Sequence, residues 1–192
     1  MGLQGMIGEM VKLCDTDITS FAPSKLAALQ GHTDANWRAL SQLITALENN
    51  KQNSTLANEI SAYTATKNVA ANIPVLGITG TGGAGKSSLT DELIRRMRLD
   101  LGDSLRIALI SIDPSRRKTG GALLGDRIRM NAISPWSQSA GPRVFMRSLA
   151  TRDVGSEISP ALPAVIAACK CAGFDLVIVE TSGIGQGDAA IV

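Results

Sequence analysis

One stretch of the sequence has the residue types and spacing of a phosphate-binding loop. Residues 80–87 read GTGGAGKS and fit the pattern G-x-x-x-x-G-K-[ST] at every fixed position. Glycines let successive backbone N–H groups turn toward a polyphosphate, and a helix that begins at Lys86 adds the partial positive charge of its N-terminus. Lys86 can reach the β- and γ-phosphates of a nucleotide, and the Ser87 hydroxyl can bind Mg²⁺. Since a plain glycine turn between a strand and a helix does not need this Lys-Ser pair, we predict a nucleotide site.

A carboxylate is expected wherever a nucleotide is bound together with Mg²⁺. Glu180 ends the apolar run Leu176–Val179, and Gly183 follows three residues later. An acid at the end of a buried strand, followed by a glycine that can contact a γ-phosphate, is typical of a Walker B strand and its switch. The other interpretation of Glu180 is a solvated acid at a strand end.

Two aspartates lie where they could reach the same site. Asp113 follows the apolar run Leu105–Ile112, and the carboxyl ends of parallel strands line one crevice. Asp126 follows a glycine-rich stretch and stands near the start of an expected helix, so both a role near Mg²⁺ and a plain helix N-terminal acid remain open for it. Nearby arginines could contact phosphates, a switch or a partner, although surface salt bridges are the more common role; they are Arg127, Arg129, Arg143, Arg147 and Arg152.

A parallel sheet has to position these residues. Short apolar runs predict strands at 75–79, 105–112, 143–148 and 175–180, and helical spacing predicts helices from Lys86 onward and over 160–171. Strands that alternate with helices indicate an α/β fold of the P-loop NTPase type, with a mostly parallel sheet flanked by helices.

The first part of the chain has no convincing strand. Helical spacing predicts helices over 34–48, with Thr33 as the N-cap, over 55–67 and 23–30, and more weakly over 3–13. We therefore divide the chain into an N-terminal helical extension, 1–72, and the N-terminal part of a P-loop domain, 73–192. The extension is either a helical cap on the following domain or an interdomain linker whose partner lies elsewhere.

Composition excludes several function classes. The chain has 192 residues, a formal charge of +2 and only six aromatic residues, which argues against nucleic-acid binding by a basic surface or by base stacking. One histidine and three cysteines leave no material for a zinc site or a disulfide framework, and they favour a cytoplasmic protein. No apolar run is long enough to span a membrane, and the N-terminus lacks the pattern of a signal peptide.

Four motifs, in order, resemble a known family. They are GTGGAGKSS at 80–88, IDPSRRKTGGALLGDRIRM at 112–130, VFMRSLATRD at 144–153 and VIVETSGIGQGD at 177–188. The set looks like the methylmalonyl-CoA mutase-associated GTPases, which are P-loop G proteins that escort adenosylcobalamin-dependent acyl-CoA mutases. The resemblance covers residues 73–192. The form ETSGIGQGD and the segment GLQGMIGEMVKLCD are most similar to the G domain of fused isobutyryl-CoA mutases, where it lies between a cobalamin-binding domain and the mutase domain.

The resemblance implies a role for each matching residue. GTP or GDP would be held by the loop, Mg²⁺ by four side chains, and Lys86, Asp113 and Glu180 would serve catalysis. The phosphate-binding residues would be Gly82, Gly83, Ala84, Gly85, Lys86, Ser87, Ser88 and Gly183, and the Mg²⁺ ligands Ser87, Asp113, Asp126 and Glu180. Slow GTP hydrolysis would gate cofactor loading and protection of a mutase, with adenosylcobalamin bound in the partner or fused domains. The expected partners are the mutase, its cobalamin-binding domain and a second copy of the chain.

The base-reading part of a G domain is missing from the sequence. A guanine-specific N-K-x-D motif does not occur in these 192 residues, so the preference for GTP follows from the resemblance alone. We expect a fragment of a longer G domain, weakly active or inactive in isolation. Two other classes stay open: a P-loop small-molecule kinase or ATPase, for which Asp113 is the one candidate base, and a helical interaction module with a vestigial loop.

Overall fold

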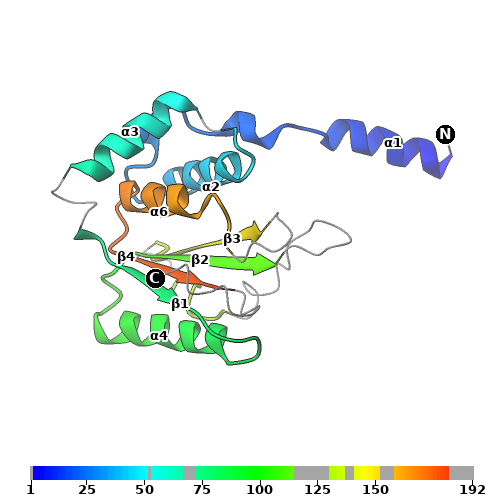
Figure 1. The fold of residues 1–192 in the computed structure, drawn as a ribbon. Coiled ribbons are helices and arrows are strands. Elements are labelled where there is room, and N and C mark those ends of the chain that lie inside the picture. The colour runs from blue at the N-terminus through cyan, green and yellow to red at the C-terminus, as the bar shows by residue number, and fades with distance from the viewer. Residues whose placement is uncertain are drawn as a thin grey trace.

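A four-stranded parallel sheet forms the centre of the molecule (Figure 1). In chain order its strands are β1 (Val75–Ile78), β2 (Ile107–Pro114), β3 (Val144–Thr151) and β4 (Leu176–Glu180), and in space they follow the order β1-β4-β2-β3. This computed structural model describes residues 2–51, 53–66, 72–114, 130–136, 141–151 and 158–181. The predicted α/β fold with a parallel sheet is confirmed, and the four predicted strands are present with small shifts of their ends.

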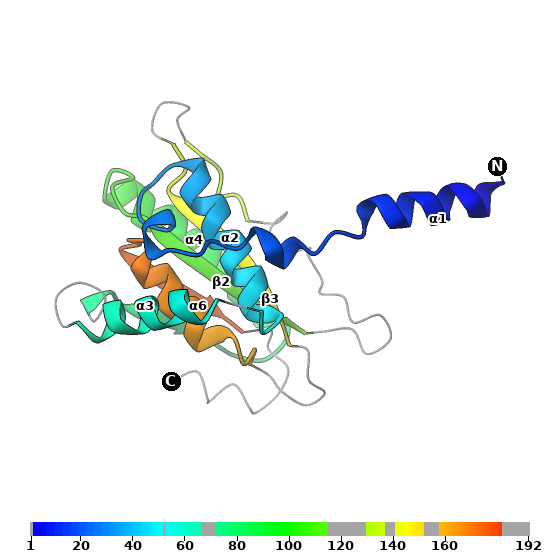
Figure 2. The ribbon, with the colours of Figure 1, turned by 90° about the horizontal axis from the view of Figure 1, so that it is seen from above.

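Helices cover both faces of the sheet. On one face lie α2 (Asp34–Glu48), α3 (Ser54–Ala65) and α6 (Leu162–Cys171), and on the other lies α4 (Lys86–Asp100), as Figures 1 and 2 show. Side chains alternate between the two faces along each strand because successive Cβ atoms point to opposite sides. This alternation decides which strand residues can meet the phosphate-binding loop, since that loop leads into α4.

The alternation is regular along β2. Ala108, Ile110 and Ile112 join the hydrophobic core beneath α2, α3 and α6. Ile107 and Leu109 join the separate core on the α4 side. Ser111 and Asp113 continue the second series, so these two polar residues lie on the α4 face of the sheet.

The N-terminal helices α2 and α3 are part of the same folding unit as the sheet. Leu40, Ile44 and Leu56 are fully buried in one core with residues of β2, β3 and β4. Trp37 of α2 contacts Phe145 of β3 at a ring-centroid distance of 5.8 Å. This packing favours the interpretation of these two helices as a cap on the sheet; the boundary at residue 72 stays a prediction.

The ends of α2 match their sequence signals. Thr33 and Asn36 form a reciprocal capping box, which confirms the predicted N-cap. At the other end, Glu48 accepts a hydrogen bond of 3.2 Å from the backbone N–H of Ala150, and its carboxylate lies 3.5 Å from Arg147 Nη2. Arg147 also donates to the Thr45 hydroxyl at 2.8 Å, so this arginine ties α2 to β3.

The first helix, α1 (Leu3–Cys14), lies apart from this packed body. All of its residues are exposed, and Figures 1 and 2 show it extending away from the sheet. The predicted helix over 23–30 is wrong, because the chain there makes only a 3₁₀ turn, Leu26–Ala28, which follows another at Ile18–Phe21. In the part of the chain that the structure describes, no helix has the length and apolar character needed to cross a bilayer.

Candidate functional site

The glycine-rich loop connects β1 to α4 with backbone angles that only glycine adopts readily. Gly83 and Gly85 have φ angles of 77° and 81°, in the left-handed region. No neighbouring atom lies within 4 Å of where a Cβ would stand at either glycine, so the backbone conformation, and not space, requires glycine there. Gly85 is the N-cap of α4, which places the first backbone N–H groups of that helix at the end of the loop.

Lys86 folds back across this loop. Its Nζ donates hydrogen bonds to the carbonyl oxygens of Gly80, at 2.7 Å, and Thr81, at 3.0 Å. The ammonium group is therefore held by the loop backbone beside the α4 N-terminus. A positive charge and free helix N–H groups at one place favour an anion there.

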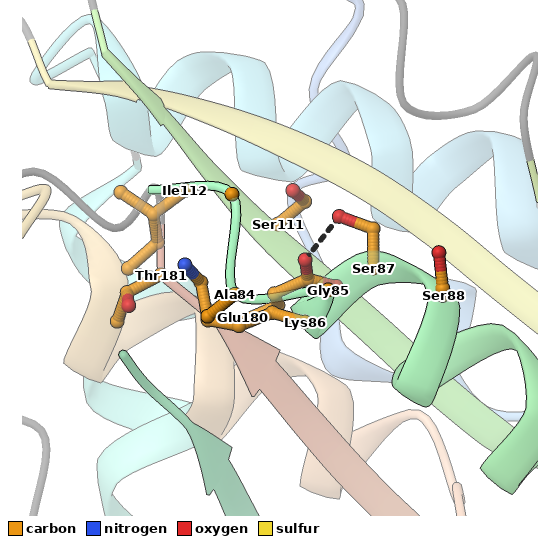
Figure 3. Close-up of a pocket in the computed structure, with 10 residues that line it drawn as sticks. Ala84, Gly85, Lys86, Ser87, Ser88, Ser111, Ile112, Glu180 and Thr181 are labelled. Atoms are coloured by element: carbon orange, nitrogen blue, oxygen red, sulfur yellow. Dashed lines mark hydrogen bonds between the residues drawn. The ribbon is translucent and has the colours of Figure 1, made fainter. Parts of the chain in front are cut away.

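Two residues 93 positions apart in the chain meet next to Lys86. The Ser87 hydroxyl donates a hydrogen bond of 2.5 Å to Glu180 Oε1. Glu180 is the last residue of β4 and is only 4% exposed, and its carboxylate points to the α4 side of the sheet (Figure 3). The interpretation of Glu180 as a solvated strand-end acid is therefore wrong: the structure brings it to the loop that the sequence singled out.

A cavity of about 290 Å³ lies at this meeting point (Figure 3). Loop, helix and strand ends contribute its walls, which are mostly polar. The described residues that line it are Gly83, Ala84, Gly85, Lys86, Ser87, Ser88, Ser111, Ile112, Glu180 and Thr181.

The structure brings together most of the residues singled out by the sequence, but not all of them. Gly83 to Ser88 and Glu180 line the cavity, whereas Gly82 is exposed on the loop and is not among the described lining residues. Asp113 is buried at the end of β2, on the α4 face but two residues beyond Ser111, and it does not line the cavity either. Asp126 and Gly183 lie outside the described residues, as do most of the arginines considered above.

Sequence reasoning missed three lining residues, Ser111, Ile112 and Thr181. Ser111 could have been found from the period of two along β2, because it shares the face of Asp113. In the ladder between β2 and β4, Ser111 is the register partner of Glu180. Thr181 follows Glu180 directly, and its hydroxyl donates to the Thr79 hydroxyl at 3.3 Å.

The side-chain oxygens of this cavity suit a small, hard cation. Mg²⁺ prefers oxygen ligands, is often held by only one or two protein carboxylates, and completes its shell with phosphate oxygens and water. Ser87 and Glu180 supply a hydroxyl and a carboxylate already in contact with each other. Within the described ranges no cluster of three or more His, Cys, Asp or Glu side chains occurs. The donor set fits a nucleotide-bound Mg²⁺.

Comparison with known proteins relates the chain to one family of GTPases. A family model described as methylmalonyl-CoA mutase-associated GTPase MeaB matches residues 40–192. The chain is 66% identical over all its 192 residues to a fused isobutyryl-CoA mutase of Cupriavidus metallidurans. It is 35% identical over 116 residues, 60% of the chain and 33% of the relative, to the GTPase ArgK of Escherichia coli.

A solved structure shares the fold. The crystal structure of an LAO/AO transport system kinase aligns with a TM-score of 0.51 at 27% identity, over 84% of this chain and 44% of that one. The chain spans only 16% of the length of the Cupriavidus mutase. The match to the family begins at residue 40, inside α2 and well before the region of the four motifs.

Proposed function

Because the chain belongs to the family of the methylmalonyl-CoA mutase-associated GTPase MeaB, we propose that it forms the nucleotide-binding part of a GTPase that serves a cobalamin-dependent acyl-CoA mutase. One observation carries the nucleotide site: the hydrogen bond between Ser87 and Glu180, which unites the phosphate-binding loop with the Walker B strand. A glycine turn without a function gives no reason for a carboxylate from β4 to be buried against the first turn of α4.

Different residues of the cavity bind the phosphates of GTP and the Mg²⁺ ion. Backbone N–H groups at the start of α4 and the Lys86 ammonium bind the phosphates, because both present positive charge to the same space. The Ser87 hydroxyl and the Glu180 carboxylate hold Mg²⁺, which when bound neutralises charge on the phosphate oxygens. To serve as ligands, these two oxygens would give up their mutual hydrogen bond, which would couple the end of β4 to the occupancy of the loop.

We keep three further site assignments as proposals. Asp113 and Asp126 complete the set of Mg²⁺ ligands, and Gly183 contacts the γ-phosphate. Asp113 is supported by its place at the carboxyl end of β2, on the face that α4 covers. Mutation of each acid to asparagine or of Gly183 to alanine, followed by Mg²⁺ titration of the nucleotide complex, tests these assignments one at a time.

Lys86→Ala tests the nucleotide site. We expect its affinity for GTP to fall at least about 10-fold, because a hydrogen bond to a charged group contributes about 1.5–3 kcal/mol. Lys12→Ala is the matched control, since Lys12 lies on the exposed helix α1 and contacts none of the lining residues. Calorimetric titration of the full-length protein compares the two variants, and equal GTP affinity in both would remove Lys86 from the site.

The partner is proposed to be a mutase that binds adenosylcobalamin, either fused to this chain or separate. Relatives fused to an isobutyryl-CoA mutase support a fused partner. GTP binding and hydrolysis would gate cofactor loading, through loop contacts that differ between GTP and GDP. The test measures adenosylcobalamin transfer to the mutase with GTP, GDP or no nucleotide. Equal transfer under all three conditions would contradict gating.

Two expectations remain predictions, the first from the family resemblance and the second from the low cysteine count. One is a homodimer, which light scattering of the full-length protein tests. The other is a cytoplasmic location, which fractionation of cells that express the protein tests.

A further inference from the structure

A row of polar side chains crosses the sheet next to the cavity. Glu180 of β4 is the register partner of Ser111 of β2, and Ser111 is in turn the partner of Ser148 of β3. All three lie on the face that α4 covers, because Leu109, Met146 and Ile178, two residues earlier on each strand, belong to the core on that side. The strand residues that precede the row on this face are apolar, so the row marks the change from the hydrophobic core to the polar end of the sheet.

Ser111 is the member of the row that lies deepest and lines the cavity. Its exposed fraction is 3%, and it is a wall residue of the cavity together with Ser87 and Glu180. Figure 3 shows Ser111 among the residues that line the cavity, near the place where Ser87 meets Glu180. None of the hydrogen bonds seen among the described residues involves this hydroxyl, although its neighbour Ser87 is fully engaged with Glu180.

Ser111 lines the cavity, so its hydroxyl is available to a water molecule or a ligand there. Apolar side chains occupy the corresponding positions earlier along the strand, so serine at 111 is not needed to fill the sheet. Ser111 is the register partner of Glu180 on the adjacent strand, and both residues line the same cavity.

Mg²⁺ bound to a nucleotide keeps several water molecules, and each of them needs hydrogen-bond acceptors around the ion. Outer hydrogen bonds of this kind hold the inner ligands in place. The other hydroxyls near the cavity do not fit the role: Thr181, the residue after β4, donates its hydroxyl to Thr79, and Ser88 is exposed.

We propose that the Ser111 hydroxyl holds a water molecule of the Mg²⁺ that Ser87 and Glu180 bind, and so helps to fix that ion on the β2 side of the cavity. The inference rests on the proposed nucleotide site. It adds a residue from the middle of the sheet to the loop and strand-end residues that bind the nucleotide. Ser148, one strand further from the cavity and absent from its described walls, has no such role.

The test measures Mg²⁺ affinity directly and does not depend on hydrolysis. Full-length protein is loaded with a fluorescent GDP analogue in EDTA, and Mg²⁺ is titrated while the dissociation rate of the nucleotide is followed. We expect Ser111→Ala to raise the apparent Mg²⁺ Kd about 10-fold, the lower end of what loss of an outer hydrogen bond costs a metal site. Affinity for the nucleotide in EDTA should stay unchanged. Ser148→Ala is the matched control, and Ser111→Thr, which keeps the hydroxyl, should restore the wild-type Kd to within about twofold.

The possible outcomes distinguish a failure of the role proposed for Ser111 from a failure of the proposed nucleotide site. An unchanged Mg²⁺ Kd in Ser111→Ala overturns the role of Ser111, and so does an equal rise in Ser148→Ala. Weaker nucleotide binding by Ser111→Ala in EDTA also overturns it, because the residue would then act on the loop or the fold and not on the ion. If the wild-type protein itself binds no nucleotide, or binds it without any effect of Mg²⁺, the proposed function fails first.

Discussion

Replacement of Arg98 by methionine should destabilise the protein far more than any exposed charge on the same helix. Arg98 lies in the last turns of α4 and is 1% exposed. Its Nε and Nη2 donate to the two carboxylate oxygens of Asp103, at 2.6 and 3.0 Å. Its Nη1 donates to the carbonyl oxygens of Ala132 and Ser134, and its guanidinium lies 4.2 Å from the ring centroid of Trp136. One side chain therefore fastens the segment 130–136 to the helix that follows the phosphate-binding loop.

The expected loss of unfolding free energy follows from the polar groups that Arg98→Met leaves without a partner. Methionine fills the space of the aliphatic stem but leaves a largely buried carboxylate at Asp103 and two carbonyl oxygens without their donor. Breaking a buried ion pair by removing one partner costs about 3–5 kcal/mol. Because the Asp103 side chain is 19% exposed, water can solvate its unpaired carboxylate in part, which lowers this cost. The two carbonyls add about 1 kcal/mol each, so we expect a total loss of about 3–5 kcal/mol.

Urea unfolding monitored by tryptophan fluorescence measures this loss, and Trp136 reports on the segment itself. Arg96→Met is the matched control: Arg96 is on the same helix and is 64% exposed in its pair with Glu92, so its loss should cost under about 1 kcal/mol. The double variant Arg98→Met with Asp103→Asn should recover part of the loss, because it removes the unpaired carboxylate. A loss below about 1 kcal/mol for Arg98→Met, equal to that of the control, would refute the reasoning.

Three further predictions concern parts of the molecule away from the loop. Burial raises the pKa of Cys169 to about 12 and that of Cys171 to about 11, so iodoacetamide at pH 8 should modify only the exposed Cys14 in the native protein. Mass spectrometry identifies the modified thiols, and rapid labelling of Cys169 or Cys171 would contradict their burial. Partial desolvation lowers the pKa of the exposed His32 from 6.5, and the charges of Arg106 and Arg143 lower it further. The unfolded chain therefore binds a proton more readily below about pH 6.5, and a small part of the stability is lost as the pH drops through this range, because solvent screens an exposed group. His32→Gln should lose that part of the pH dependence in urea unfolding, and an unchanged profile would exclude His32 as its source. Glu48→Ala removes the acceptor of a backbone N–H at the end of β3 and should cost about 1–3 kcal/mol of unfolding free energy, whereas a cost near zero would show that α2 is not held there.

Much of the fold could be predicted because its signals are local. The strand β4 and the helix α2 are found where the apolar runs and the capping residues put them. The local pattern over 23–30 predicts a helix, whereas the structure has only a 3₁₀ turn there, in which the backbone N–H of Leu26 donates a hydrogen bond to Glu59 of α3, 33 residues away. Such a contact has no signature in the local sequence.

Those parts of the site could be predicted in which the chemistry requires particular residue types at fixed positions in the sequence. The loop and Glu180 could be identified because glycines, lysine and a strand-end acid are needed at fixed places for phosphate and Mg²⁺. The period of two along β2 puts Ser111 on the face of Asp113, but its residue type alone does not single it out, since serine in a strand is common. Its relevance depends on the order of the strands, which places β2 next to β4, and the sequence does not state that order. For the same reason Arg98 could not be told from a surface arginine: its partners lie 34 and 36 residues further along the chain.

Competition between nucleotides tests the central claim most directly. The full-length protein is loaded with a fluorescent GTP analogue in the presence of Mg²⁺, and unlabelled GTP, GDP or ATP is added in turn. The cavity between the loop and β4 predicts that the analogue binds, and membership of the MeaB family predicts that GTP and GDP displace it and that ATP, at the same concentration, does not. Displacement by ATP as efficient as that by GTP, or failure of the analogue to bind at all, would contradict the account.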